Sequence, residues 1–363
     1  MAERVYNFAS GPAVLPLPAM EEAQRDLLAL PGVGSSILEI SHRSKPFLAI
    51  IEAAEANLRQ LLGIPGNYKV LFLQGGARLQ FAILPMNFLP QGSSADYVLA
   101  GTWGRTANTE ALTQGKTRVV WDGQACAYRR MPAQEELDLD PGAAYLHITS
   151  NETIQGIQIS SEPDSGNVPL FCDSSSDFLH RKVPVERYGV LYACAQKNAG
   201  PAGVTIAIIR EDLFDRVPAG LPSLLSYKAI ADAGSLLNTP PCFAVYMVKL
   251  VTDWLLRDIG GLDRMHAINK EKAAMLYEAV DGSGGFYKGH AEPAHRSLMN
   301  VTFTLPNEDA EKAFHAGAAK LGLMELKGHR SVGGCRASIY NAMPREGVVL
   351  LRDYMVDFAK KNG

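Results

Sequence analysis

The sequence VLYACAQKNAGPAGVTIAII at residues 190–209 holds two continuous apolar runs, 190–193 and 204–209, joined by a short glycine-rich connection. Apolar residues that follow one another without alternating polar ones are typical of strands covered on both faces. The connection at 194–203 is too short for a helical crossover, so we predict that the second strand runs antiparallel to the first.

Short apolar runs of the same kind recur earlier in the chain. They lie at residues 70–73, 97–100, 118–121, 144–148 and 168–172. Several are separated by segments long enough for a helix, which is the pattern of parallel β-α-β units. We therefore predict the α/β class, with a mostly parallel seven-stranded sheet in a large domain.

Segments with helical periodicity lie before and after the predicted strands in the sequence. After Gly260-Gly261, predicted helices and strands alternate again. Apolar residues recur every three or four positions over 46–62 and 243–257, and a further helix is predicted at 18–30. Beyond the glycine pair, the pattern predicts helices at 262–280, 308–321 and 346–361 and strands at 300–305 and 335–340. We predict a large domain at 16–260 and a smaller α+β C-terminal domain at 261–363, which also takes the N-terminal segment 1–15.

The composition argues against several classes of protein. The 363 residues include 35 Lys and Arg against 38 Asp and Glu, a formal charge of −3, without the basic stripe of a nucleic-acid-binding protein. The apolar runs are far shorter than the ~20 residues of a membrane-spanning helix, and the N-terminus lacks the apolar core of a secretory signal. Five cysteines without CxxC spacing and histidines without ligand spacing argue against disulfides and a metal site. We predict a cytoplasmic protein with no nucleic-acid, membrane or metal partner.

Two charged residues follow consecutive predicted strands, and they would flank one pocket if these strands are neighbours in the sheet. Asp173 ends the run at 168–172, and Lys197 follows the run at 190–193. Ligands of open α/β sheets bind at the carboxyl ends of the strands, where desolvation favours the neutral, nucleophilic amine of a lysine. A pyridoxal phosphate enzyme requires this pair, a lysine to bind the cofactor aldehyde and an aspartate to keep the pyridine nitrogen protonated. Taken singly, each residue is more typical of a solvated loop charge.

Two further features fit the same hypothesis. The turn at Gly75-Gly76 precedes a helix, whose first N–H groups can bind a phosphate, and Trp103 can stack on a ring. The turn matches neither the dinucleotide nor the P-loop fingerprint, so by itself it is also explained as a tight strand-to-helix turn.

A set of basic residues has no acidic residue beside it in the sequence. Arginine forks match carboxylates and phosphates bidentately, so such a set suits a doubly anionic substrate. A His-Arg-Ser triplet occurs three times, at 42–44, 295–297 and 329–331, so one copy alone is also explained as solvated surface charge. The set comprises His42, Arg43, Arg78, His329, Arg330 and Arg336.

Taken together, eight ordered blocks of sequence make the chain resemble the phosphoserine aminotransferase family from residue 7 to the C-terminal helix. They are Asn7-Phe8 with Ser10-Gly11-Pro12-Ala13, Ser41-His42-Arg43-Ser44-Lys45, Asn67-Tyr68-Lys69-Val70-Leu71-Phe72, Asn151-Glu152-Thr153-Ile154, Ala195-Gln196-Lys197-Asn198, Asn238-Thr239-Pro240-Pro241, Gly328-His329-Arg330-Ser331-Val332-Gly333-Gly334 and Arg336-Ala337-Ser338-Ile339-Tyr340-Asn341-Ala342-Met343-Pro344. The resemblance implies a fold-type I pyridoxal phosphate transferase that acts as a homodimer with shared active sites.

The resemblance also implies roles for individual residues. Lys197 would bind the cofactor covalently and shuttle the proton, and Asp173 would pair with the pyridine nitrogen. The remaining cofactor contacts would come from Trp103 on the ring, Thr153 on the ring hydroxyl, Ala77, Arg78 and Gln196 on the phosphate, and the partner subunit's Asn238 and Thr239. Arg336 would bind the substrate α-carboxylate, and the distal phosphate or carboxylate would be left to His42, Arg43, Arg78, His329 and Arg330.

The implied reaction converts 3-phosphohydroxypyruvate and L-glutamate to O-phospho-L-serine and 2-oxoglutarate, reversibly and by a ping-pong mechanism, in serine biosynthesis. A second reaction, on 4-phosphohydroxy-L-threonine in vitamin B6 synthesis, is neither favoured nor opposed by the residues. Two alternatives stay open: another fold-type I enzyme, such as an alanine–glyoxylate transaminase or a cysteine desulfurase, and a non-catalytic scaffold that binds pyridoxal phosphate. Cys194, Cys242, His180 and the Gly104-Arg105-Thr106 segment depart from the family pattern.

Overall fold

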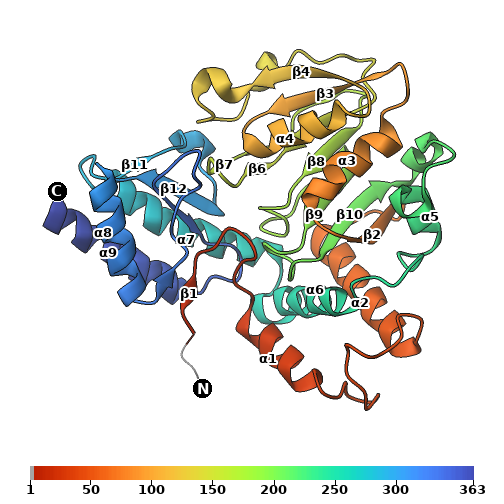
Figure 1. The fold of residues 1–363 in the computed structure, drawn as a ribbon, viewed down its shortest axis with the longest axis horizontal. Helices are drawn as coiled ribbons and strands as arrows, with labels where there is room; N and C mark the ends of the chain where they lie inside the picture. The colour runs from red at the N-terminus through yellow and green to blue at the C-terminus, as the bar shows by residue number, and fades with distance from the viewer. Residues whose placement is uncertain (1–3) are drawn as a thin grey trace.

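The computed structural model describes residues 4–363, and its centre is a seven-stranded sheet of order β2-β10-β9-β8-β5-β3-β4 (Figure 1). Strand β10 is antiparallel to both β2 and β9, and the other neighbouring pairs are parallel. The predicted mostly parallel sheet and the antiparallel run at 204–209 are therefore confirmed. The strands are β2 (Tyr68–Gln74), β3 (Ser94–Leu99), β4 (Lys116–Asp122), β5 (Leu146–Thr149), β8 (Leu170–Asp173), β9 (Tyr188–Cys194) and β10 (Val204–Arg210).

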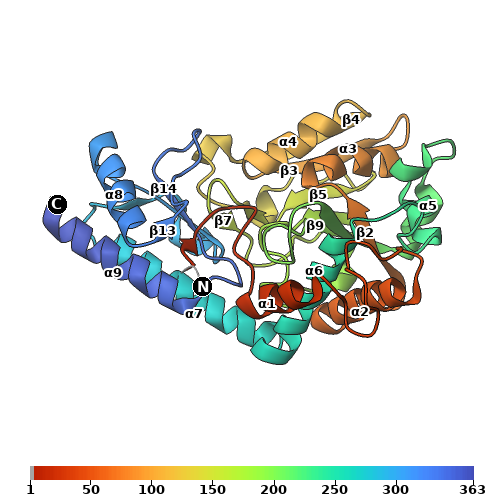
Figure 2. The same ribbon diagram turned by 60° about the horizontal axis from the view of Figure 1, so that its bottom comes forward.

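Both faces of this sheet are covered, which explains the continuous apolar runs. On β10, Ile206 and Ile208 pack into the cluster formed with helices α2 (Lys45–Leu62) and α6 (Cys242–Trp254). Ala207 and Ile209 pack into the cluster under α3 (Ala77–Phe88) and α4 (Thr102–Ala111). Figure 2 shows α3 and α4 on one side of the sheet and α2 and α6 on the other. Successive side chains of a strand point to opposite faces, so a strand buried on both sides needs apolar residues at every position.

The helices follow the predicted periodicity closely. They are α1 (Leu17–Asp26), α2 (Lys45–Leu62), α3 (Ala77–Phe88), α4 (Thr102–Ala111), α5 (Tyr227–Asp232), α6 (Cys242–Trp254), α7 (Leu262–Asp281), α8 (Glu308–Lys320) and α9 (Arg345–Asn362). In α2, Ser44 Oγ caps the first turn and Gly63 ends the helix in the left-handed conformation, at φ 65°. Among the helices of residues 4–363, none combines the length and apolar composition needed to cross a bilayer.

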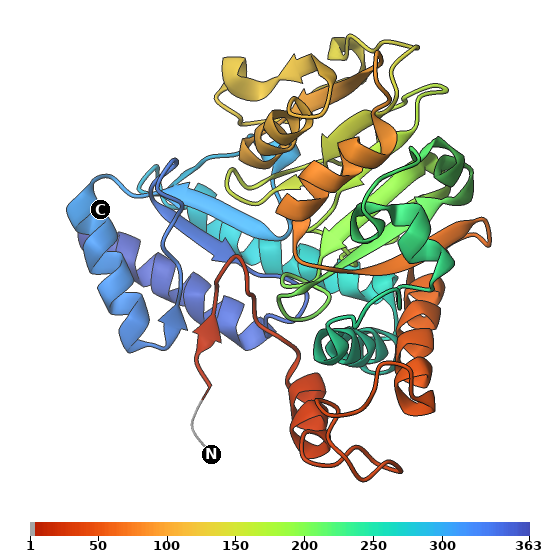
Figure 3. The same cartoon turned by 45° about the vertical axis from the view of Figure 1, so that its right-hand side comes forward.

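The C-terminal part packs around a second apolar cluster. Strands β11 (Lys288–Gly289), β12 (Asn300–Thr304) and β14 (Cys335–Ser338) form an antiparallel sheet, against which α8 and α9 pack. The N-terminal strand β1 (Tyr6–Asn7) pairs with β13 (Leu323–Met324) at the edge of this unit, and Phe8 is buried in its cluster. Figure 3 shows this strand, in red, beside the blue C-terminal elements.

One helix belongs to both parts of the molecule. Leu262 and Met265, at the start of α7, pack with the large sheet, whereas Leu276 and Val280, near its end, pack in the C-terminal cluster. The change from one cluster to the other therefore lies within α7, between Ile268 and Ala273. The division at residue 260 stays a prediction, and so does the assignment of residues 1–15, of which 1–3 lie outside the described residues.

Candidate active site

The carboxyl ends of β2, β5, β8 and β9 meet at one edge of the large sheet, because all four strands run in the same direction. Asp173 ends β8, and Lys197 lies in the turn after β9. The hairpin of β6 (Asn151–Glu152) and β7 (Ile157–Gln158) follows β5 at the same edge and carries Thr153 in its turn. Parallel strand order thus collects chemically active residues that are distant in sequence.

The amine of Lys197 has two close neighbours in the structure. Its Nζ donates to Thr153 Oγ1 at 2.6 Å and lies 5.7 Å from the centre of the Trp103 ring. Trp103 belongs to the first turn of α4, and Arg78 Cζ lies 5.9 Å from the same ring. A flat aromatic wall therefore stands beside the amine.

Asp173 is buried at the base of the same pocket. Its Oδ1 accepts a hydrogen bond from the backbone N–H of Ser175 at 2.9 Å. Burial raises the pKa of Asp173, while Ser175 and Lys197 act in the opposite direction. A buried carboxyl group facing an open pocket is suited to bind a cationic N–H of a ligand, since such a partner would keep it ionised.

A second buried carboxyl group, Glu152, sits behind Trp103. Its two oxygens accept hydrogen bonds from the backbone N–H groups of Trp103 at 2.9 Å and Gly104 at 2.7 Å, at the start of α4. Burial raises the pKa of Glu152 to about 7, although these two hydrogen bonds lower it. A Cβ on Gly101 would lie 2.6 Å from the carboxyl carbon, so this glycine makes room for the acid. Glu152 therefore fixes the turn that carries the aromatic wall.

The start of α3 offers an anion site. Gly75, at φ 90°, turns the chain between β2 and α3, and Gly76 at the N-cap supplies no capping side chain. The free N–H groups of the first helical turn, at Ala77 and Arg78, therefore border the pocket, where the helix dipole favours a phosphate.

Cations line the opposite wall, contributed by the C-terminal part. Arg336, on β14, donates from Nη2 to Ser10 Oγ at 2.7 Å, and His329 and Arg330 come from the loop before β14. Within residues 4–363, neither Arg78, Arg330 nor Arg336 forms an ion pair with a carboxylate. These guanidinium groups are therefore available to an anionic ligand.

The cavity between these walls measures about 600 Å³, the usual size of a small-molecule site. The predicted site residues that line it are Ala77, Arg78, Trp103, Thr153, Asp173, Gln196, Lys197, His329, Arg330 and Arg336. The remaining four do not line this cavity in the single chain. Asn238 borders a different cavity, Thr239 accepts from Gln74 through its carbonyl, and His42 and Arg43 precede α2.

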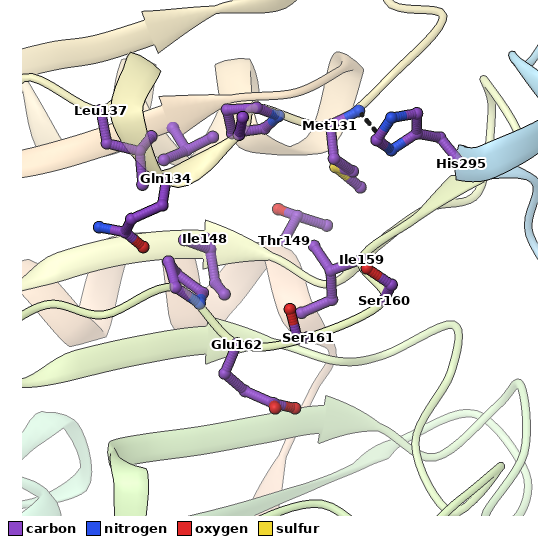
Figure 4. Close-up of a pocket in the computed structure, with 14 residues that line it drawn as sticks. Met131, Gln134, Leu137, Ile148, Thr149, Ile159, Ser160, Ser161, Glu162 and His295 are labelled. Carbon is purple, nitrogen blue, oxygen red and sulfur yellow. Dashed lines mark hydrogen bonds between the residues drawn. The ribbon is translucent and has the colours of Figure 1, made fainter.

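A second, smaller cavity has a volume of about 250 Å³. Figure 4 shows the residues that line it. It shares Thr149 with the larger cavity, and otherwise it is lined by residues such as Met131, Glu162 and His295. None of the predicted site residues lines it. The larger cavity is therefore the candidate active site.

Ser10 and Thr149, which line the larger cavity, and Glu152, which lies beside it, make contacts that the sequence pattern does not predict. Glu152 and Ser10 stood within recognised blocks, but nothing in the pattern showed what either side chain contacts. Thr149 lines the cavity with a buried hydroxyl that has no hydrogen-bond partner in the described residues. A polar residue that ends an otherwise apolar strand was the available signal for Thr149.

The cavity fits pyridoxal phosphate. It offers an amine at Lys197, a buried acid at Asp173, a flat wall at Trp103 and an uncapped helix start at Ala77. The unpartnered hydroxyl of Thr149 is a further polar atom that a bound ligand could satisfy.

Comparison with known proteins agrees with this geometry. The family model for aminotransferase class V matches residues 5–351, so the chain belongs to the class-V aminotransferases. A curated phosphoserine aminotransferase from Desulfosudis oleivorans is 53% identical over the full length of both chains. The chain is thus a member of the phosphoserine aminotransferase family, and its cofactor is pyridoxal phosphate.

Solved structures of the same family superpose closely. The phosphoserine aminotransferase from Bacillus circulans subsp. alkalophilus is 47% identical, with a TM-score of 0.97 and full coverage of both chains. A phosphoserine aminotransferase from Trichomonas vaginalis described as bound to PLP is 38% identical, with a TM-score of 0.92, over 97% of this chain and 99% of that one. The fold-type I fold predicted from the sequence is confirmed.

Proposed function

We propose that this enzyme transfers the amino group of L-glutamate to 3-phosphohydroxypyruvate, forming O-phospho-L-serine and 2-oxoglutarate, reversibly and by a ping-pong mechanism. One observation carries this proposal. A single cavity holds the Lys197 amine and the buried Asp173 opposite three arginines that lack carboxylate partners within residues 4–363. We place the reaction in serine biosynthesis.

Each of the cavity residues has a role that follows from its position. Bound pyridoxal phosphate supplies an aldehyde that accepts an amino group and a ring that delocalises the electron pair left when Cα loses its proton. Lys197 holds the cofactor and moves the proton at Cα, and Thr153 orients its Nζ. Asp173 stabilises the protonated ring nitrogen, and Trp103 excludes water from one face.

Two acids that differ at the distal end must use one site. Both carry an α-carboxylate, which we assign to Arg336. The distal groups, a phosphate in one substrate and a carboxylate in the other, are left to Arg78, His329 and Arg330. Flexible cations accept either anion, because guanidinium forks match both groups. The same distal phosphate occurs in 4-phosphohydroxy-L-threonine, which belongs in the same assay.

We further propose a homodimer with shared active sites. Asn238, Thr239, His42 and Arg43 do not line the cavity of their own chain, so a second copy would have to supply them. Leu28, 86% exposed, and Leu38, 62% exposed, leave apolar surface on the segment between α1 and α2 that also carries His42. Light scattering should give twice the chain mass. Mixing inactive Lys197→Ala protein with inactive Asn238→Ala protein should restore part of the activity.

The direct test is a coupled assay of the purified holoenzyme with glutamate and phosphohydroxypyruvate. Lys197→Ala should abolish turnover and the visible absorbance band of the bound cofactor. Lys182→Ala removes an exposed lysine paired with Asp263 and should leave both unchanged. Near-normal turnover by Lys197→Ala would refute the assignment, and so would a wild-type enzyme that uses non-phosphorylated hydroxypyruvate equally well.

A further inference from the structure

A completely buried lysine lies outside the cavity, in the middle of α7. Lys272 Nζ donates to the backbone carbonyls of Ile339 at 2.9 Å, Tyr340 at 2.7 Å, Asn341 at 3.3 Å and Met343 at 3.2 Å. No carboxylate forms an ion pair with it within residues 4–363. Four carbonyl oxygens around one nitrogen resemble the coordination of a monovalent cation, so this carbonyl cage favours the ammonium form.

Burying this amine is costly unless its donors are satisfied. Burial lowers the pKa of Lys272 to about 7, whereas the four carbonyl dipoles stabilise the charge. An apolar side chain of similar length would fill the space without that cost, but it would leave the carbonyls of the 339–343 segment without its donors. The lysine therefore holds a piece of backbone that lies outside helices and strands.

The segment held by Lys272 continues directly from β14, which carries Arg336. Tyr340 Oη donates to the carbonyl of Ser10 at 2.7 Å, and Ser10 Oγ accepts from Arg336 at 2.7 Å. Asn300 Nδ2 donates to Tyr340 Oη at 3.2 Å, which fixes the phenol on its other side. The position of the Arg336 guanidinium thus depends on the segment beneath it.

The same segment also reaches the residue after Lys197. The backbone N–H of Asn341 donates to Asn198 Oδ1 at 2.9 Å, and its side chain donates to the carbonyl of Leu179 at 2.9 Å. On the other side, Asn269 Nδ2, one turn before Lys272 on α7, donates to Asn341 Oδ1 at 2.8 Å. The segment therefore joins the Arg336 wall to the Lys197 wall.

We propose that Lys272 is a positioning residue for transamination, whose ammonium group fixes the 339–343 segment and thereby the separation of Arg336 from Lys197. A substrate must place its α-carboxylate on Arg336 and its α-carbon beside Lys197. The distance between these two residues therefore controls how tightly the substrate binds. The inference rests on the proposed role of Arg336 as the α-carboxylate site.

The test compares Lys272→Met with Lys270→Met, which changes an exposed lysine on the same helix. In Lys272→Met we expect KM to rise about tenfold for glutamate and for phosphohydroxypyruvate alike, with a much smaller change in kcat. In Lys270→Met we expect both constants to stay at wild-type values. A role in stability alone would lower Tm of Lys272→Met and leave its KM values unchanged, which would overturn the proposal.

Hydrogen exchange measured by mass spectrometry gives a second readout that needs no turnover. Backbone amides of residues 336–343 should exchange faster in Lys272→Met than in Lys270→Met, both with and without cofactor. If wild-type protein fails to turn over the two substrates, the proposed function fails, while the exchange comparison still decides whether Lys272 fixes the segment. Unchanged exchange at 336–343 would overturn the inference with the function intact.

Chemical rescue separates the ammonium group from simple packing. In Lys272→Ala, propylammonium should lower the raised KM values toward wild type, whereas propanol of the same length should not. Equal rescue by both would show that volume alone matters and would overturn the proposal. If these variants do not fold, Lys272→Gln keeps two N–H donors, and the same KM and exchange measurements apply. If Lys272→Gln has wild-type KM values and wild-type exchange at residues 336–343, the ammonium group is not needed and the proposal is overturned.

Discussion

Lys197 and Thr153 are 44 residues apart in the sequence, and their side chains meet at 2.6 Å, Nζ to Oγ1. Lys197 follows β9, and Thr153 lies in the turn of the β6–β7 hairpin. A typical hydrogen bond within a protein contributes about 0.5–1.5 kcal/mol, so this contact favours one orientation of the amine. The two strand ends are therefore linked through the reactive group itself.

Thr153→Val keeps the shape of the side chain and removes the acceptor for Lys197 Nζ. We expect kcat to fall about two- to tenfold, which corresponds to the loss of one hydrogen bond of about 0.5–1.5 kcal/mol. Thr109→Val, at an exposed position on α4, is the matched control and should retain wild-type kcat. Steady-state kinetics of both holoenzymes check this, and equal kcat values would contradict an orienting role for Thr153.

Glu152→Gln should change how stability depends on pH. Because burial raises the pKa of Glu152 from 4.5 to about 7, its contribution to folding is fully present below about pH 4.5 and is lost as pH rises through about 7. Between pH 5 and pH 8, the free energy of unfolding of the wild-type protein should therefore fall by up to about 3 kcal/mol relative to that of the variant, at about 1.4 kcal/mol per pKa unit. Denaturant unfolding of both proteins at several pH values measures this, and a constant difference would rule it out.

Arg336→Ala should weaken both substrates, because both carry the α-carboxylate. Removing one partner of a half-buried, charge-assisted contact costs about 2–3 kcal/mol, so we expect KM to rise roughly 30- to 150-fold for glutamate and for phosphohydroxypyruvate. Arg43→Ala should instead raise KM chiefly through lost contacts to the distal anion. The comparison uses phosphohydroxypyruvate and hydroxypyruvate as paired substrates, and an identical pattern in both variants would contradict the division.

Gly156→Ala should destabilise the protein through two effects. Gly156 has φ 70°, and a Cβ there would lie 2.5 Å from Thr302 Oγ1 and 2.6 Å from the carbonyl of Asn300. We expect the free energy of unfolding to fall by about 2–5 kcal/mol, the sum of the strain of a left-handed backbone and the cost of overpacking. Gly166→Ala, at φ 59° in open space, carries the strain alone and should cost only about 1–2 kcal/mol. Equal losses in urea unfolding would show that the close approach is unimportant.

The local pattern predicted the scaffold well because each element is specified by neighbouring residues. The continuous run at 204–209 reads as a doubly covered strand, and its ten-residue connection to the previous run allows only an antiparallel return. Similarly, the helix at 45–62 shows its buried face, its cap and its glycine stop within the sequence itself. Asp173 and Lys197 are predicted as site residues because Asp173 ends one predicted strand and Lys197 lies four residues after the end of another.

The short elements were harder to predict. The pairing of β1 with β13 joins residues more than 300 positions apart, and two-residue strands carry no periodicity. Glu152 gave no separate signal either, since its partners are backbone N–H groups of a helix that starts 50 residues earlier. Lys272 reads as one of several lysines on a helix, and only the folded chain shows the carbonyls around it.

The amino-acid sequence by itself determined the class of fold and the family, and it predicted Asp173 and Lys197 as the residues on which the cofactor chemistry depends. Those features come from local periodicity and from residues next to strand ends, which a linear pattern can carry. Only the tertiary structure decided which side chains meet in the cavity, that four predicted site residues stay outside it in the single chain, and that a buried ammonium group secures the wall bearing Arg336. Such contacts join residues that are far apart in the sequence. Their distances are fixed only when the helices pack on both faces of the sheet.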